Sequence, residues 1–201
     1  MRIFSYVIEH DLGFAPNPFF GVCTLACCKP RIRKYARIGD VVIGTGSKTV
    51  NRQGYLTYWM RVDQIISFEE YWHNPNFAVK KPNMNGSTIQ RYGDNIYWRR
   101  PNTSEWGQLD SFHSEPDGSL SRGNLQKDTG TTDKILIGEE FSYWGQSGPK
   151  IPDILADFVV KSQGHKCRFS SERKDAFVAW IGTLAERGYV DEPANWQYIE
   201  V

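Results

Sequence analysis

The chain has 201 residues, of which 24 are Lys or Arg and 23 are Asp or Glu, so its net charge is only +1. This length suits one domain with a real interior, and the balanced charge means that attraction to a polyanion must come from local clusters of charge. No stretch approaches the roughly 20 apolar residues of a membrane span, and the first apolar run is too short for a secretion signal. We therefore expect no membrane partner.

The four cysteines indicate a reducing compartment. Cys27 and Cys28 are adjacent and could hardly both reach distant disulfide partners. Zinc is an alternative use, since the chain offers Cys23, His165 and Cys167 as further ligands. Structural zinc sites, however, combine two paired knuckles, and the spacings here imitate that arrangement only loosely. We therefore predict reduced, metal-free thiols, no cofactor and a cytoplasmic location.

Elements can be predicted along the chain from periodicity, prolines and glycines. Strands are predicted at residues 2–8, 22–28, 41–47, 54–66, 95–100 and 134–145. Helices are predicted at 30–36, 68–72, 151–160 and 170–187. For the last helix we expect Ser171 as the N-cap and Gly188 just beyond the C-terminus.

The strand predicted at 54–66 alternates between two faces. Its apolar face is the better core, whereas the other face carries Trp59 between a threonine and an arginine. We expect that second face to be exposed. From 74 to 134 the chain is dense in Asn, Gly, Ser, Thr, Asp and Pro, which indicates an irregular insertion that carries function.

These elements predict an α+β fold in a single domain, 1–201. We expect a small, strongly curved mixed or antiparallel β-barrel with C-terminal helices packed on it. Residues 1–73 would form half of the barrel with a short basic helix, 74–134 the polar insertion, and 135–201 a strand and the C-terminal helices.

Several spaced motifs support a family resemblance. "GFAPNPFFGVCTLACCKPRIRKYARIGDVVIGTGS", "YGDNIYWRR", "QLDSFHS" and "ILIGEEFSYWG", with a closing Trp-bearing helix, resemble the nucleotide modification associated domain of the second type. That family occurs in bacteria and phages, and the resemblance implies a role in systems that make or handle modified nucleotides. It implies no particular catalytic residues. The order of strand, basic helix, "GD" and strand is also similar to the PUA, ASCH and EVE barrels, which bind RNA or DNA and often hold a modified base in an aromatic pocket.

Cationic, aromatic and small residues are the candidates for binding nucleic acid. Arg31, Arg33 and Lys34 crowd one short helix and could neutralise phosphates. The strand that ends in "GTGS" offers Gly44 and Ser47 to a phosphate.

Rings and an amide are the candidates for binding a base. Trp59 could stack on a base, and the proline-rich loop could present Asn17 to a base edge and Phe19 to its face. The alternative is that the solvated helix and the buried rings are only structural.

Catalysis is the competing interpretation. His10, Asp11 and His113 can move protons near neutral pH, and Cys23 or Ser114 could act as a nucleophile. We predict binding of a nucleotide or nucleic acid, with a modified base as one form of the ligand, as the main function. An enzyme acting on that nucleotide and a module that binds another protein are the two alternatives.

Overall fold

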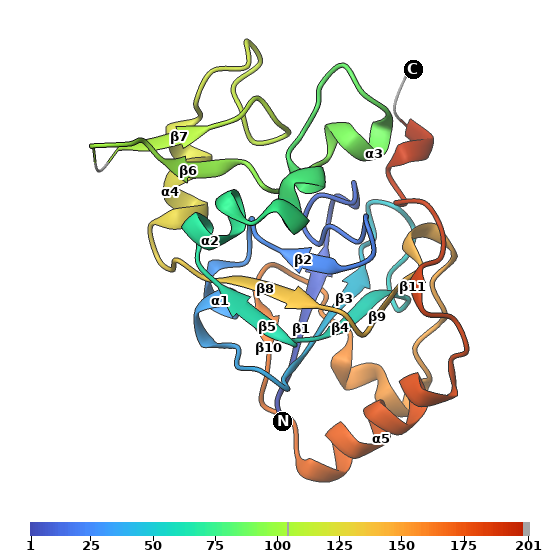
Figure 1. Cartoon of the computed structure of the whole chain (residues 1–201). Helices are drawn as coiled ribbons and strands as arrows, with labels where there is room; N and C mark the ends of the chain where they lie inside the picture. The colour runs from blue at the N-terminus through green and yellow to red at the C-terminus, as the bar shows by residue number, and fades with distance from the viewer. Residues whose placement is uncertain (104, 199–201) are drawn as a thin grey trace. The chain divides into compact units, whose positions relative to one another are not determined.

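The computed structural model describes residues 1–103 and 105–198. The chain folds into two compact units (Figure 1). The first unit comprises Met1–Leu12, Ala36–Asp63 and the chain from Gly138 onward, and the second comprises Gly13–Tyr35 and Gln64–Ile137. The polar segment 74–134 therefore belongs wholly to the second unit.

A six-stranded mixed sheet forms the first unit, with the strand order β10-β1-β3-β4-β9-β11. Its strands are β1 (Ile3–Ile8), β3 (Val41–Gly46), β4 (Leu56–Arg61), β9 (Phe141–Tyr143), β10 (His165–Lys166) and β11 (Gly188–Tyr189). β1 pairs in parallel with β3, and β3 pairs antiparallel with β4. The sheet is open, with β10 and β11 at its ends, so the mixed α/β character is confirmed but the described residues contain no closed barrel.

The C-terminal part of the chain covers one face of this sheet. The helices of the first unit are the 3-10 turns η2 (Gly145–Ser147), η3 (Asp153–Phe158) and η4 (Trp196–Tyr198) and the helix α5 (Ser171–Thr183). Ser170, not Ser171, caps α5, because its Oγ accepts from Arg173 N at 3.3 Å. The helix ends before the expected Gly188, which lies in β11 instead.

Burial of Trp59 follows from this covering. The residue is only 4 % exposed and packs with Trp144, Phe158 and Phe177 in one apolar cluster. The expectation that its face of β4 is exposed is therefore wrong, since both faces of this central strand are covered. The predicted strand 54–66 is also interrupted: β4 ends at Arg61, and Gln64–Ile66 forms a separate strand, β5.

Short elements around a second apolar core build the second unit. A three-stranded sheet has the order β2-β8-β5, where β2 is Cys23–Leu25 and β8 is Ile135–Gly138. A hairpin pairs β6 (Tyr97–Arg99) with β7 (Trp106–Gln108). The helices are α1 (Pro30–Tyr35), α2 (Phe68–His73), η1 (Pro75–Lys80), α3 (Thr88–Arg91) and α4 (Arg122–Thr129).

Local caps explain why the polar segment 74–134 is more regular than expected. Asn74 caps η1 through its side chain, and Ser87 forms a capping box with Gln90 at the start of α3. The polar residues that suggested irregular chain are thus partly helix signals. Among the described residues, every helix is too short or too polar to cross a membrane.

Candidate active site

The turn between β2 and α1 holds the sulfur at the centre of the candidate site. Cys28 and Lys29 both have left-handed backbone angles, with φ of 58° and 42°. Such angles are uncommon in residues other than glycine and are found at functional sites when the surroundings hold them. Here Asp128 Oδ1 accepts from Cys28 N at 2.6 Å, and Arg33 Nε donates to Cys28 O at 2.9 Å. Both peptide groups of Cys28 are therefore fixed.

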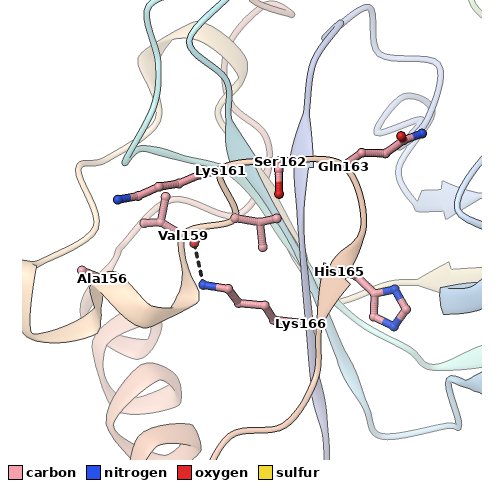
Figure 2. Close-up of a pocket in the computed structure, with 8 residues that line it drawn as sticks. Ala156, Val159, Lys161, Ser162, Gln163, His165 and Lys166 are labelled. Atoms are coloured by element: carbon pink, nitrogen blue, oxygen red, sulfur yellow. Dashed lines mark hydrogen bonds between the residues drawn. The ribbon is translucent and has the colours of Figure 1, made fainter.

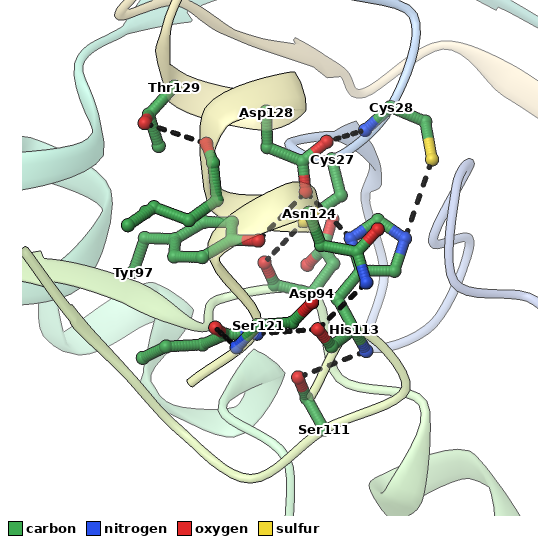
Figure 3. A network of polar contacts seen from close by, with 12 residues as sticks. Cys27, Cys28, Asp94, Tyr97, Ser111, His113, Ser121, Asn124, Asp128 and Thr129 are labelled. Atoms are coloured by element: carbon green, nitrogen blue, oxygen red, sulfur yellow. Dashed lines mark hydrogen bonds and ion pairs between the residues drawn. The ribbon is translucent and has the colours of Figure 1, made fainter. Parts of the chain in front are cut away.

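His113 lies between this cysteine and Asp128 (Figure 3). Its Nε2 is 3.6 Å from Cys28 Sγ, and its Nδ1 is 2.6 Å from Asp128 Oδ2. Asp128 is fully buried and also accepts from Tyr97 OH at 2.9 Å. A sulfur, an imidazole and a carboxylate thus form one continuous chain of contacts.

Several bonds fix the loop that carries His113. Gln108 Nε2 and Asn124 Nδ2 both donate to His113 O at 2.9 Å, and His113 N donates to Ser111 Oγ at 3.3 Å. The Phe14 ring packs against the imidazole with centroids 4.6 Å apart. The imidazole is therefore held from its main chain and from one side of its ring.

The electrostatics of this cluster make His113 a cation at neutral pH. Burial by itself lowers the pKa of His113, but its hydrogen bonds to Asp128 and Cys28 outweigh burial and raise the pKa from 6.5 to about 9. Burial tends to raise the pKa of Asp128, yet the bond and charge of His113 hold it below the usual value. The pair is thus a buried imidazolium and carboxylate.

This arrangement contains the parts of nucleophilic catalysis. A sulfur nucleophile lies beside a histidine, and a buried carboxylate orients that histidine through its other nitrogen. A histidine held beside a cysteine in this way is the arrangement that activates a sulfur nucleophile. Cys28 is half-buried, whereas Cys23 and Cys27 are fully buried.

A metal ion is the alternative use of the same place. Ligand atoms of Cys27, His113 and Asp128 all lie within 4.8 Å of one another. Burial, followed by the nearby carboxylate of Asp128, raises the pKa of the Cys27 thiol well above its usual range. A neutral thiol is a poor ligand, and both His113 Nδ1 and the Asp128 carboxylate already bond within the protein. We therefore interpret His113 and Asp128 as members of a hydrogen-bonded triad with Cys28, and not as metal ligands together with Cys27.

A second buried polar network supports the preceding segment of the chain. Lys80 Nζ donates to Asn17 Oδ1 at 2.7 Å and to Thr24 Oγ1 at 3.2 Å. Thr24 in turn donates to Asp94 Oδ2 at 2.6 Å, and Tyr71 OH donates to Asp94 Oδ1 at 2.7 Å. Burial lowers the pKa of Lys80 to about 8 and raises that of Asp94. The network ties η1 to the chain just before Cys28.

The three cations predicted to bind phosphate have different environments. Arg33 is fully buried, and its guanidinium donates to the main-chain carbonyls of Cys28, Lys134 and Asp128. Arg31 and Lys34 are exposed on the other side of α1. Only these two present their charge to solvent.

The proline-rich loop buries two of its candidate side chains, Asn17 and Phe19. Asn17 is fully buried, where its Nδ2 donates to Tyr92 O at 2.8 Å and its Oδ1 accepts from Lys80. Phe19 is also buried, whereas Phe20 is 43 % exposed. The amide of Asn17 therefore serves the second polar network.

The remaining predicted positions belong to the first unit. Gly44 lies in the middle of the sheet, where a Cβ would come within 2.4 Å of Ile8 Cδ1. Ser47 is buried and donates weakly to Glu9 O at 3.5 Å. Together with the burial of Trp59, these environments give the three residues structural roles.

The two other predicted acid-base residues also lie in the first unit. His10 is exposed, whereas the buried carboxylate of Asp11 accepts from Tyr143 OH and from Ala194 N. Of the predicted catalytic residues, only His113 therefore lies in the cluster with Cys28.

An open pocket of about 410 Å³ lies on the first unit around the loop before β10 (Figure 2). Lys161, Ser162, His165 and Lys166 contribute to its lining. The Lys166 amine donates to Asp157 O and to Val159 O, both at 2.9 Å. Main-chain carbonyls thus accept hydrogen bonds from this lysine. We therefore regard the cluster around Cys28 in the second unit as the stronger candidate site.

Sequence reasoning missed two of the three members of the triad. The sequence predicts a strand through Cys28, but this residue lies directly before Lys29 and the helix-starting Pro30, where a turn is required. Asp128 follows His113 by fifteen positions in a polar segment, and no motif marks it. The sequence signal that could have identified Cys28 is a strand followed by a turn that carries a cysteine and then by the start of a helix.

The fold and the site together define the class: a protein with a candidate nucleophilic centre. A strand–turn–helix segment carries Cys28 at its turn, and His113 and Asp128 lie beside that turn. A comparison with protein families identifies the family of the chain. Residues 1–200 match the family described as nucleotide modification associated domain 2, and the chain belongs to this family. No curated protein and no solved structure is similar enough to the chain to count as a match.

Proposed function

We propose that this protein is an enzyme of a nucleotide modification system that uses Cys28 as a covalent nucleophile. One observation carries the proposal: Cys28 Sγ lies 3.6 Å from His113 Nε2, while His113 Nδ1 lies 2.6 Å from the buried Asp128 carboxylate. The left-handed backbone at Cys28 supports it, because strain of this kind persists where function requires it.

Acyl transfer is the chemistry that this arrangement supports. The Cys28 thiolate would attack the carbonyl carbon of an ester or amide, forming a sulfur–carbon bond. His113 Nε2 would give its proton to the departing oxygen or nitrogen as the bond to that atom breaks, leaving a thioester on Cys28. The neutral imidazole would then take a proton from an incoming water or amine, which displaces the sulfur and restores the starting pair. Asp128 would keep Nδ1 protonated throughout.

A nucleotide or nucleic acid is the proposed substrate. The family description associates the domain with nucleotide modification. Exposed Arg31 and Lys34 lie on the helix that directly follows Cys28, so their charges support binding of a phosphate near the sulfur. An acyl group carried by a modified base, or added to one, would fit both observations.

Alkylation of the cysteines tests the proposal without knowledge of the substrate. The native protein is treated with limiting iodoacetamide at pH 7, and labelling of each cysteine is followed by mass spectrometry. Cys167 serves as an internal control, because it is also half-buried but lies in the first unit. A cysteine beside an oriented histidine is an activated nucleophile, so we expect Cys28 to react about tenfold faster than Cys167.

Two variants assign that reactivity to the triad. His113→Ala and Asp128→Asn should each slow the labelling of Cys28 severalfold and leave that of Cys167 unchanged. Equal rates for the two cysteines in the wild-type protein, or a Cys28 rate that is insensitive to both substitutions, would remove the basis for the proposal.

Binding of nucleic acid without chemistry is a second candidate function, favoured by the exposure of Arg31 and Lys34. Replacing both with Gln should weaken binding to a single-stranded oligonucleotide and flatten its salt dependence by about one unit of slope for each phosphate that the variant no longer neutralises. An unchanged affinity and slope would show that these two cations are only a solvated surface.

A further inference from the structure

Phe112 is an exposed aromatic side chain next to the triad. The residue is 48 % exposed, although the next residue in the chain is the buried His113. Isolated exposed apolar residues are common, so exposure alone carries no argument. The surroundings of this ring distinguish it.

Two other rings hold Phe112 in place. The Phe14 ring packs edge-on against it with centroids 5.6 Å apart, and the Tyr92 ring lies 5.8 Å away. Phe14 also contacts the imidazole of His113, whose own ring is 6.1 Å from Phe112. Phe112 and the Cys28 sulfur are therefore both neighbours of the same imidazole.

Internal hydrogen bonds hold the loop that carries Phe112. Ser111 N donates to Ser114 Oγ at 3.0 Å, and Ser114 Oγ donates to Leu109 O at 3.1 Å. Together with the two bonds to His113 O, these contacts close the loop on itself. A ring that is held in this way loses little conformational freedom when a ligand packs on it.

We infer that Phe112 is the surface on which a nucleobase of the substrate stacks while Cys28 acts on a group attached to that base. This inference rests on the proposed function, since it assigns the ring a role beside the sulfur. A flat aromatic ring accepts any base through its face, and such stacking gives sequence-tolerant binding. The part of the ligand that Phe112 would contact is the base, whether that base belongs to a free nucleotide or to a strand.

Protection of Cys28 from iodoacetamide tests the inference. The probes are the four nucleoside 5′-monophosphates, a single-stranded DNA 12-mer and ribose 5-phosphate, which has no base. We expect at least one probe with bases to protect Cys28, and ribose 5-phosphate to protect only at much higher concentration. The mononucleotide and 12-mer arms show which source of the base is bound.

Variants of Phe112 then assign the protection to its ring. Phe112→Ala and Phe112→Leu should raise the half-protecting concentration about 5- to 150-fold, the range expected when a base can no longer stack on an aromatic ring, whereas Phe112→Trp should preserve protection. Phe112→Leu keeps an apolar contact with Phe14 and Tyr92, so it controls for loss of folding. Phe20→Ala is the matched control, because Phe20 is an exposed ring elsewhere in the same unit and should leave protection unchanged.

Each failure has its own signature. Equal protection of the wild-type, Phe112→Ala and Phe112→Leu proteins, or protection by ribose 5-phosphate as strong as by the nucleotides, would overturn the stacking role of Phe112. The same holds if none of the probes protects the wild-type protein. The rate of Cys28 labelling without any probe reports on the triad, and so on the proposed function, separately.

Discussion

Replacing Asp128 with Asn should lower the pKa of His113 from its value of about 9 in the wild-type protein. The carboxylate is the main group that opposes the effect of burial on this imidazole, so removal of its charge leaves only the contact with Cys28 against the effect of burial. The amide nitrogen of Asn would also face Nδ1 and would favour the tautomer that carries its proton on Nε2. That tautomer cannot accept a proton at Nε2, the nitrogen that lies beside Cys28.

The size of the effect follows from the pKa. One pKa unit corresponds to 1.36 kcal/mol, so a rise from 6.5 to about 9 means that the folded state favours the imidazolium by about 3 kcal/mol. Because the folded pKa is raised, this stabilisation is fully present below pH 6.5 and is lost as the pH rises through 9. The lowered pKa of Asp128 belongs to the same pair and is not an additional gain.

Lys80 has the opposite pH dependence in the same unit. Its pKa is lowered from 10.5 to about 8, so the protein gains stability as the pH rises between these values. The two effects overlap between pH 8 and 9 and partly cancel in the wild-type protein. The difference in the free energy of unfolding between wild type and Asp128→Asn is therefore the informative quantity, because Lys80 contributes to both proteins.

Two measurements check this prediction. An NMR titration of the imidazole protons should give a pKa of about 9 for His113 in the wild-type protein and a clearly lower pKa in Asp128→Asn. Urea unfolding should show that the variant loses more stability at pH 6 than at pH 10, by up to about 3 kcal/mol. A His113 that still titrates near 9 in the variant, or a loss of stability that does not change with pH, would refute the assigned ion pair.

The other predictions concern stability and the thiols. Arg33→Met should lower the free energy of unfolding by at least about 2 kcal/mol, because it leaves buried carbonyls without donors. Arg31→Met, on the exposed side of the same helix, should change the free energy of urea unfolding by less than about 0.5 kcal/mol. Gly44→Ala should lower the free energy of unfolding by about 1–3 kcal/mol, because the new Cβ would clash with Ile8 Cδ1. Gly182→Ala should be neutral or stabilising, because the Cβ there would meet open space. Equal effects of the two substitutions would contradict the packing argument. A thiol assay on the denatured protein should find all four cysteines free, and elemental analysis should find no zinc at one per chain, since the sequence lacks paired knuckles; stoichiometric zinc would assign the cluster to a metal.

Local signals predicted much of the fold, whereas long-range pairing was beyond them. The strand at residues 2–8, the helix that starts at Pro30 and the strand at 41–47 were all predicted from their own residues. The closed barrel was an inference about which strands pair, and that depends on residues far apart in the chain. The burial of Trp59 has the same cause, because the segment that covers it lies about a hundred positions later.

The candidate site shows the same division. His113 could be selected from its residue type, since few side chains titrate near neutral pH. Its partners Cys28 and Asp128 are separated from it by 85 and 15 positions, and nothing in the sequence pairs them. The side chain of Arg33 was expected in solvent for a similar reason: on a six-residue helix with several cations, the sequence does not show which one faces the interior.

Buried charge around Cys28 is the feature that connects the fold with the proposed chemistry. Burying Arg33, His113 and Asp128 in one small unit is not an efficient route to stability, because each charge loses water and well-packed apolar side chains often do as well or better. What these groups provide is position: Asp128 holds the Cys28 N–H and the imidazole, while Arg33 holds the Cys28 carbonyl and the end of the helix that carries Asp128. The strained turn is thus fixed by the same groups that set the charge beside its sulfur. Helix α1 therefore carries one buried arginine, which fixes the Cys28 carbonyl, and two exposed cations, Arg31 and Lys34, which we propose to bind a phosphate.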